Sequence, residues 1–149
     1  MPFRFDASVS IDRPPDEVWA FLANHDNQLA WRHDVLSVAL VFGEPMAIGA
    51  RYQYEIRGLF RTLVVAVQLM EVVEGERFLI QTLTGPVDLE AVTELSASDS
   101  ATTVRISGRG RLRGLARALE LAGPLLGWRS RRSLVRDLAA LKRALEAAA

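Results

Sequence analysis

The chain has 149 residues and half of them are hydrophobic, so we expect one domain over residues 1–149 with a sizeable core. Its 18 basic and 18 acidic residues balance, which excludes a strong bulk attraction to nucleic acid or to an anionic membrane. It holds no cysteine, which excludes disulfides, thiolate metal sites and cysteine nucleophiles. No apolar run reaches the roughly 18 residues of a membrane span. The first ten residues lack the apolar core of a signal peptide, so we expect a soluble cytoplasmic protein without stable membrane insertion.

The N-terminal segment predicts a strand, a sharp corner and two short helices. Residues 3–11 alternate between apolar and polar side chains, as a half-buried strand does. Pro14 and Pro15 end this strand because proline cannot donate to a ladder, and Pro15 suits the first turn of a helix. A second short helix is expected to begin at the capping segment 24–26 and to run to Trp31.

The middle of the chain predicts six further strands separated by short turns. These turns carry glycine, proline and serine, which favours hairpins and antiparallel neighbours. Nothing helical interrupts the run, so a parallel sheet is not expected. The predicted strands span residues 35–42, 50–57, 62–73, 77–84, 87–95 and 102–111.

The C-terminal segment after Gly114 predicts a long helix with a kink at Gly123-Pro124. Its apolar stripe is formed by Leu115, Leu119, Ala122, Leu126, Leu134, Leu138, Leu141 and Leu145. Near the middle of this stripe the side chains become small, at Ala122, Gly123, Gly127, Ser130 and Ser133. Small residues on a helix that crosses a concave sheet leave space, so we expect the widest part of an internal cavity there.

Several segments, in this order, resemble the START-like (SRPBCC) superfamily, and within it the polyketide cyclase/dehydrase and lipid-transport group. The resemblance implies an α+β helix-grip fold. In that fold a curved antiparallel sheet of about seven strands surrounds a long C-terminal helix, and two short helices follow the first strand. The segments are "IDRPPDEVWAFLAN", Trp31, "IGARYQYEI", "LMEVVEGERFLIQTLTGPVDLEAVTEL", "TTVRISGRG" and the terminal "LAALKRALE".

The resemblance also implies that an apolar small molecule is held in a deep cavity between the sheet and the helix. It implies no cofactor here. The branch that hydroxylates aromatic compounds is excluded, because the chain has neither the extra iron–sulfur domain nor cysteines.

Six residues are the candidate ligand contacts. Tyr52 and Tyr54 share a strand face with Ile56 and would offer flat surface and hydroxyl groups to a ring-bearing or long-chain ligand. Ordinary core packing with the hydroxyls at the rim is the alternative. Trp31 is expected at the cavity mouth or as a structural plug. The full set is Trp31, Tyr52, Tyr54, Glu90, Leu126 and Ser130.

Glu90 has two interpretations that depend on strand register. It alternates with apolar residues, as Arg105 and Arg109 do in the next strand. The simplest pairing sets the acids against the arginines on the outer, wet face of the sheet. In another register Glu90 and an arginine would form a buried pair inside the cavity and could anchor a ligand.

No catalytic or metal-binding constellation is evident in the sequence. His25 and His33 are the two histidines, and their separation does not match the i,i+4 spacing of a helical metal pair. Surface or capping positions are the ordinary interpretation for both. The sequence therefore predicts no metal site and leaves catalytic residues unknown.

These observations favour a carrier or sensor of an apolar small molecule, such as a lipid or a polyketide-like aromatic. The alternative is a polyketide cyclase or dehydratase that acts in the same cavity, with Tyr52, Tyr54, Glu90 or Arg105 as its polar group. A third hypothesis concerns residues 62–70, which are apolar on both strand faces. They would make the outer face of the sheet a candidate homodimer interface.

Overall fold

The computed structural model describes residues 2–58, 60–113 and 123–147, and of 123–128 it describes only the helical backbone. The helices are α1 (Pro15–Ala23), the 3-10 helix η1 (His25–Ala30) and α2 (Gly123–Ala147). No helix in these ranges is long and apolar enough to cross a membrane. The strands are β1 (Phe3–Ile11), β2 (Val35–Phe42), β3 (Arg51–Arg57), β4 (Thr62–Val73), β5 (Arg77–Thr82), β6 (Val87–Ser98) and β7 (Ala101–Leu112).

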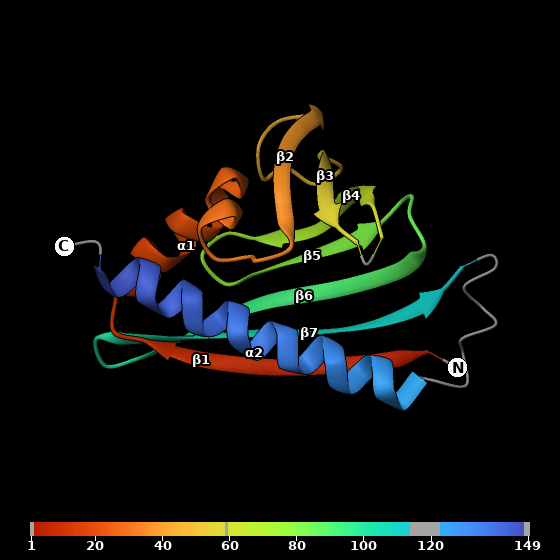
Figure 1. Cartoon of the computed structure of the whole chain (residues 1–149). Coiled ribbons are helices and arrows are strands. Elements are labelled where there is room, and N and C mark those ends of the chain that lie inside the picture. Colours follow the sequence, from red (N-terminus) through yellow and green to blue (C-terminus); the bar gives the residue numbers. More distant parts are fainter. Residues whose placement is uncertain (1, 59, 114–122, 148–149) are drawn as a thin grey trace.

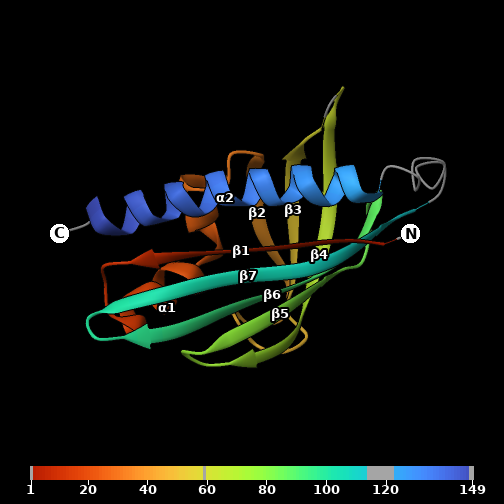
Figure 2. The same ribbon diagram turned by 90° about the horizontal axis from the view of Figure 1, so that it is seen from below.

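The strands form one seven-stranded sheet in the order β1-β7-β6-β5-β4-β3-β2, and each pair of neighbours is antiparallel. The sheet curves strongly, so that β2, β3 and β4 stand at a steep angle to β1, β7 and β6 (Figure 1). Helix α2 lies along β1 and crosses the concave side (Figure 2). This is the α+β helix-grip architecture that the sequence predicted.

The corner after β1 has the predicted cause. Pro14 is extended, with φ −69° and ψ 156°, and Pro15 opens α1 at the first helical position. Asn24 then separates the two short helices and caps η1, because its side chain accepts a hydrogen bond from the Asp26 amide. The double proline thus turns the chain off the sheet and starts the two helices that close one end of it.

The register of β6 and β7 confirms the simpler pairing of acids and arginines. Glu90 lies opposite Arg109, and Glu94 lies opposite Arg105. On the other face of the same strands Ala91 lies opposite Gly108, which in turn lies opposite Phe5 of β1. The charged rows therefore face outward, and the apolar rows face the core.

Helix α2 is fixed to β1 by an apolar stripe and by polar contacts at its C-terminal end. Leu138, Leu141 and Leu145 are buried, as the predicted stripe requires. Lys142 donates to the Ser10 carbonyl at 2.7 Å, and Glu146 accepts from the Asp12 amide at 3.0 Å. The predicted helical stretch 115–122 and the side chains of Leu126 and Gly127 lie outside the described residues.

Candidate ligand-binding site

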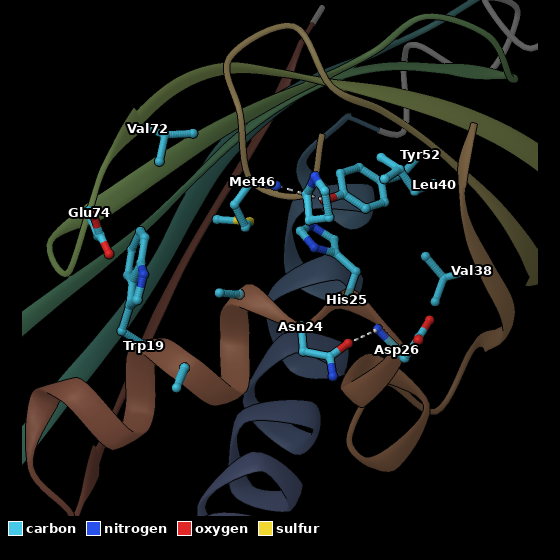
Figure 3. A pocket seen from close by; sticks show the side chains of 13 residues that line it. Trp19, Asn24, His25, Asp26, Val38, Leu40, Met46, Tyr52, Val72 and Glu74 are labelled. Carbon is cyan, nitrogen blue, oxygen red and sulfur yellow. Dashed lines mark hydrogen bonds between the residues drawn. The ribbon is translucent and has the colours of Figure 1, made fainter. Parts of the chain in front are cut away.

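A pocket of about 730 Å³ lies between the short helices and the steep end of the sheet (Figure 3). Its walls come from α1, η1, β2, the loop between β2 and β3, β3, and the hairpin that joins β4 to β5. The lining residues are Trp19, Ala20, Ala23, Asn24, His25, Asp26, Val38, Leu40, Pro45, Met46, Tyr52, Val72 and Glu74. No described residue of α2 is among them.

Two stacked rings form one wall of the pocket. The imidazole of His25 lies on the phenol ring of Tyr52, with ring centroids 3.9 Å apart and an angle of 16° between the planes. His25 opens η1 and Tyr52 comes from the inner face of β3, so the stack joins the helical end to the sheet. The result is a flat aromatic surface of the kind that packs against ring-bearing ligands.

His25 is the most unusual polar residue of the pocket. Its side chain is buried, at 4% exposure, and neither ring nitrogen has a hydrogen-bond partner among the described residues. Desolvation by burial lowers the pKa of His25, against smaller opposing effects of the Ala23 backbone and the Asp26 charge. The imidazole is therefore neutral at neutral pH, and apart from a weak contact with the Ala23 backbone its donor and its acceptor have no partner among the described residues.

Tyr52 is held in place by the loop that borders the pocket. The Met46 amide donates to the Tyr52 hydroxyl at 3.1 Å. Met46 itself has a positive φ of 59°, which L-residues seldom adopt, and its side chain contributes to the pocket wall. Backbone strain of this kind persists where the surroundings enforce it, often next to a binding site.

The remaining walls are apolar and the rim is acidic. Trp19 packs edge-on against Phe78, with ring centroids 5.9 Å apart, and Val38, Leu40 and Val72 complete the apolar lining. Asp26 and Glu74 are exposed at the rim, and the described lining includes no lysine or arginine. The electrostatics of the pocket thus favour neutral or cationic ligands over anions.

The structure places some of the predicted ligand contacts in the pocket and others outside it. Tyr52 lines the pocket, as expected. Tyr54 is buried behind it, where its hydroxyl accepts from the Gln28 side chain at 3.1 Å and burial raises its pKa. Trp31 is buried in the core at 6% exposure, which fits the expected structural plug and not the expected position at the cavity mouth.

The other three predicted contacts do not line this pocket. Glu90 lies on the outer face of the sheet, 3.8 Å from Arg109, so the hypothesis of a buried pair inside the cavity is wrong. Ser130 is half-buried on α2 and takes no part in the walls. The Leu126 side chain lies outside the described residues. The pocket therefore opens at the short helices rather than under the middle of α2.

Sequence reasoning missed His25 and Met46 as pocket residues. It favours a capping or surface position for His25, because the cap at Asn24 is visible in the sequence and the stack on Tyr52 is not. A tertiary contact between residues 25 and 52 leaves no periodic signal. The sequence offers only an indirect signal: a histidine directly after a helix cap points toward either the solvent or the core, and the sequence does not say which.

His33, Asp34 and Asp137 form a cluster with metal-ligand chemistry away from the pocket. One donor atom from each lies within 4.8 Å of the others. Arg32 already supplies positive charge there, with its Nε 3.4 Å from Asp137 and 3.6 Å from Asp34. His33 Nδ1 lies 2.6 Å from Asp137 Oδ1. The cluster therefore connects α2 to the segment before β2 through hydrogen bonds and an ion pair.

Comparisons with known proteins agree with this architecture. The aromatase/cyclase Zhui from Streptomyces sp. R1128 superposes with a TM-score of 0.82 at 15% identity, over 98% of this chain and 94% of its own. TTHA0849 from Thermus thermophilus gives 0.80 at 15% identity, over 98% and 99%. Ara h 8.0201 gives 0.73 at 13% identity, over 99% of each chain. At such identities the likeness shows the fold. No curated protein sequence matches.

The curved seven-stranded sheet, the C-terminal helix and these neighbours define a helix-grip fold. A family model described as polyketide cyclase / dehydrase and lipid transport matches residues 2–146. The chain belongs to that family.

Proposed function

We propose that the protein binds an apolar, ring-bearing small molecule in the pocket between α1, η1 and β2–β4, as a carrier or sensor. The observation that carries this proposal is the combination of apolar walls with the stacked rings of His25 and Tyr52. A volume of about 730 Å³ falls within the roughly 300–1,000 Å³ typical of small-molecule sites. The flat ring surfaces favour a polyketide-like aromatic over a simple acyl chain.

Uptake of a fluorescent apolar dye tests the proposal. Wild-type protein is expected to bind Nile red with saturation at one site. Ala20→Phe adds a ring to the pocket wall and should weaken uptake several-fold. Ala39→Phe is the matched control, because Ala39 lies opposite Gln53 on the outer face of the sheet and does not line the pocket. Saturable binding that Ala20→Phe leaves unchanged, or no binding at all, would contradict the proposal.

A second function, a cyclase or dehydratase in the same pocket, is favoured by one specific observation. The neutral, unpartnered imidazole of His25 can accept a proton from an activated carbon of a poly-ketone, and the Tyr52 phenol lies against it. Incubation with a synthetic poly-β-ketone, followed by absorbance of an aromatic product, separates the two functions. Binding without consumption supports the carrier, and consumption that His25→Phe abolishes supports the enzyme.

A further inference from the structure

The buried imidazole of His25 lacks the hydrogen-bond partners that buried polar groups normally have. Both ring nitrogens are shielded from solvent, and apart from a weak contact with the Ala23 backbone they have no hydrogen-bond partner among the described residues. A buried polar group without a partner is costly, and each one in a folded protein calls for an explanation. The same ring belongs to the wall of an open pocket. A partner that arrives with a ligand is the simplest explanation for a group in this position.

The stack on Tyr52 allows the imidazole to meet such a partner. A half-turn of an imidazole ring exchanges its nitrogen and carbon positions and leaves the ring plane unchanged. After such a turn the imidazole keeps its contact with the Tyr52 ring, which is itself fixed by the Met46 amide. Hydrogen bonds of apo sites commonly align only when the ligand is bound.

The chemistry of the walls limits the polar group that a ligand can carry. Asp26 and Glu74 stand at the rim, and no basic side chain is found in the described lining, so a carboxylate or a phosphate would meet repulsion. A hydroxyl group is neutral and both donates and accepts, so it matches either tautomer of a neutral imidazole. A hydroxyl group therefore satisfies both constraints.

We propose that His25 makes the pocket selective for ring-bearing ligands with a hydroxyl group, by a hydrogen bond between that hydroxyl and the imidazole. This inference rests on the proposed function, because it assumes that the pocket binds a small molecule. It assigns His25 as the specificity-determining residue and Tyr52 as the surface on which the histidine ring is held.

Three ligands with one ring system test the inference: naphthalene, 2-naphthol and 2-naphthoate. Dissociation constants are measured by calorimetry at neutral pH. Wild-type protein should bind 2-naphthol on the order of tenfold more tightly than naphthalene, and 2-naphthoate most weakly. His25→Phe should bind both neutral ligands with nearly equal affinity. His33→Gln is the matched histidine control, since His33 lies outside the pocket, and it should keep the preference.

A measurement on the wild-type protein covers the case in which His25→Phe does not fold. The ring ¹⁵N chemical shifts of His25 should move on addition of 2-naphthol and stay nearly unchanged with naphthalene. Shifts that respond equally to both ligands would overturn the hydrogen bond.

Failure of the inference is distinguishable from failure of the proposed function. Equal affinities of wild-type protein for naphthalene and 2-naphthol, or a preference that survives in His25→Phe, would overturn the role of His25 and leave the binding function intact. No binding of any of the three ligands would overturn both.

Discussion

At the scale of single residues, Trp31 shows a buried polar atom with no partner. Its indole lies in the core at 6% exposure, and Nε1 is buried without a hydrogen bond among the described residues. Trp31→Phe removes that N–H and keeps an aromatic ring, so it should leave stability within about 1 kcal/mol of wild type. Trp31→Ala removes the ring as well and should cost on the order of 3–5 kcal/mol. Urea unfolding measures both, and equal losses would show that the nitrogen is satisfied after all.

Asp137 carries the second prediction at this scale. Its carboxylate is buried and accepts from the His33 ring and the His33 amide, with Arg32 beside it. Asp137→Asn removes the carboxylate that faces Arg32 and accepts from the His33 ring, and it should cost about 1–3 kcal/mol. Asp6→Asn is the control. Asp6 pairs with Arg105 on the exposed face, where solvent screens the interaction, and its loss should be smaller. Thermal unfolding of both variants at low salt gives the comparison.

The candidate site was predictable from the sequence only where the signal is local. Strand alternation put Tyr52 on one face of its strand together with Tyr54 and Ile56, and in the structure Tyr52 lines the pocket. The role of His25 depends on a stack between residues 25 and 52, and the burial of Trp31 depends on how η1 meets the sheet. Contacts between distant segments are set by packing, which periodicity does not encode.

At the scale of elements, β7 and β1 pack closely because two glycines of β7 lie under two phenylalanine rings of β1. A Cβ at Gly108 would collide with the Glu90 carbonyl oxygen and would lie 2.6 Å from the Phe5 ring. A Cβ at Gly110 would meet the Phe3 ring at 2.5 Å. Aromatic side chains that cover glycines on a neighbouring strand fix register as well as packing.

Because a backbone oxygen cannot move aside as a side chain can, Gly108→Ala should destabilise more than Gly110→Ala. Overpacking of this kind costs roughly 1–3 kcal/mol, and we expect the upper part of that range for Gly108→Ala. Guanidinium unfolding of the two variants is the measurement. A larger loss for Gly110→Ala would mean that the Phe3 ring is the less adaptable neighbour.

The helices and strands were more predictable from the sequence than the contacts between distant segments. The bounds of β1, β2 and β4 match the predicted ranges, and the double-proline corner and the Asn24 cap have the expected geometry. β6 runs to Ser98 rather than to residue 95, because its pairing with β7 continues to Ala101. A strand end set by its partner, rather than by a turn residue of its own, is difficult to locate from sequence.

At the scale of the whole molecule, the two edges of the sheet differ. The β1 edge is covered by α2, whose Lys142 bonds the Ser10 carbonyl (Figure 2). The β2 edge ends the sheet, and no residue from Val35 to Phe42 is charged. Val41 is 54% exposed and Phe42 is 61% exposed. An apolar edge strand without charge or proline is a template for pairing with another strand.

We propose that this edge pairs antiparallel with β2 of a second copy of the chain. A twofold axis at Ala39 would set Val38 opposite the partner's Leu40 on the same face and would place no like charges together. Val38 and Leu40 also line the pocket, so the partner strand would extend its wall. Register shifts near both ends of β2 shorten the regular stretch, which makes the association weak.

Concentration-dependent dimerisation is therefore expected, and a lysine on the edge should prevent it. Val41→Lys places a charge that two paired β2 strands would have to bury, and it should weaken self-association at least about tenfold. Val135→Lys adds the same charge at an exposed position of α2 and should leave association unchanged. Light scattering over a dilution series measures all three proteins. A wild-type protein that stays monomeric at every concentration, or equal effects of the two lysines, would show that β2 is not the interface.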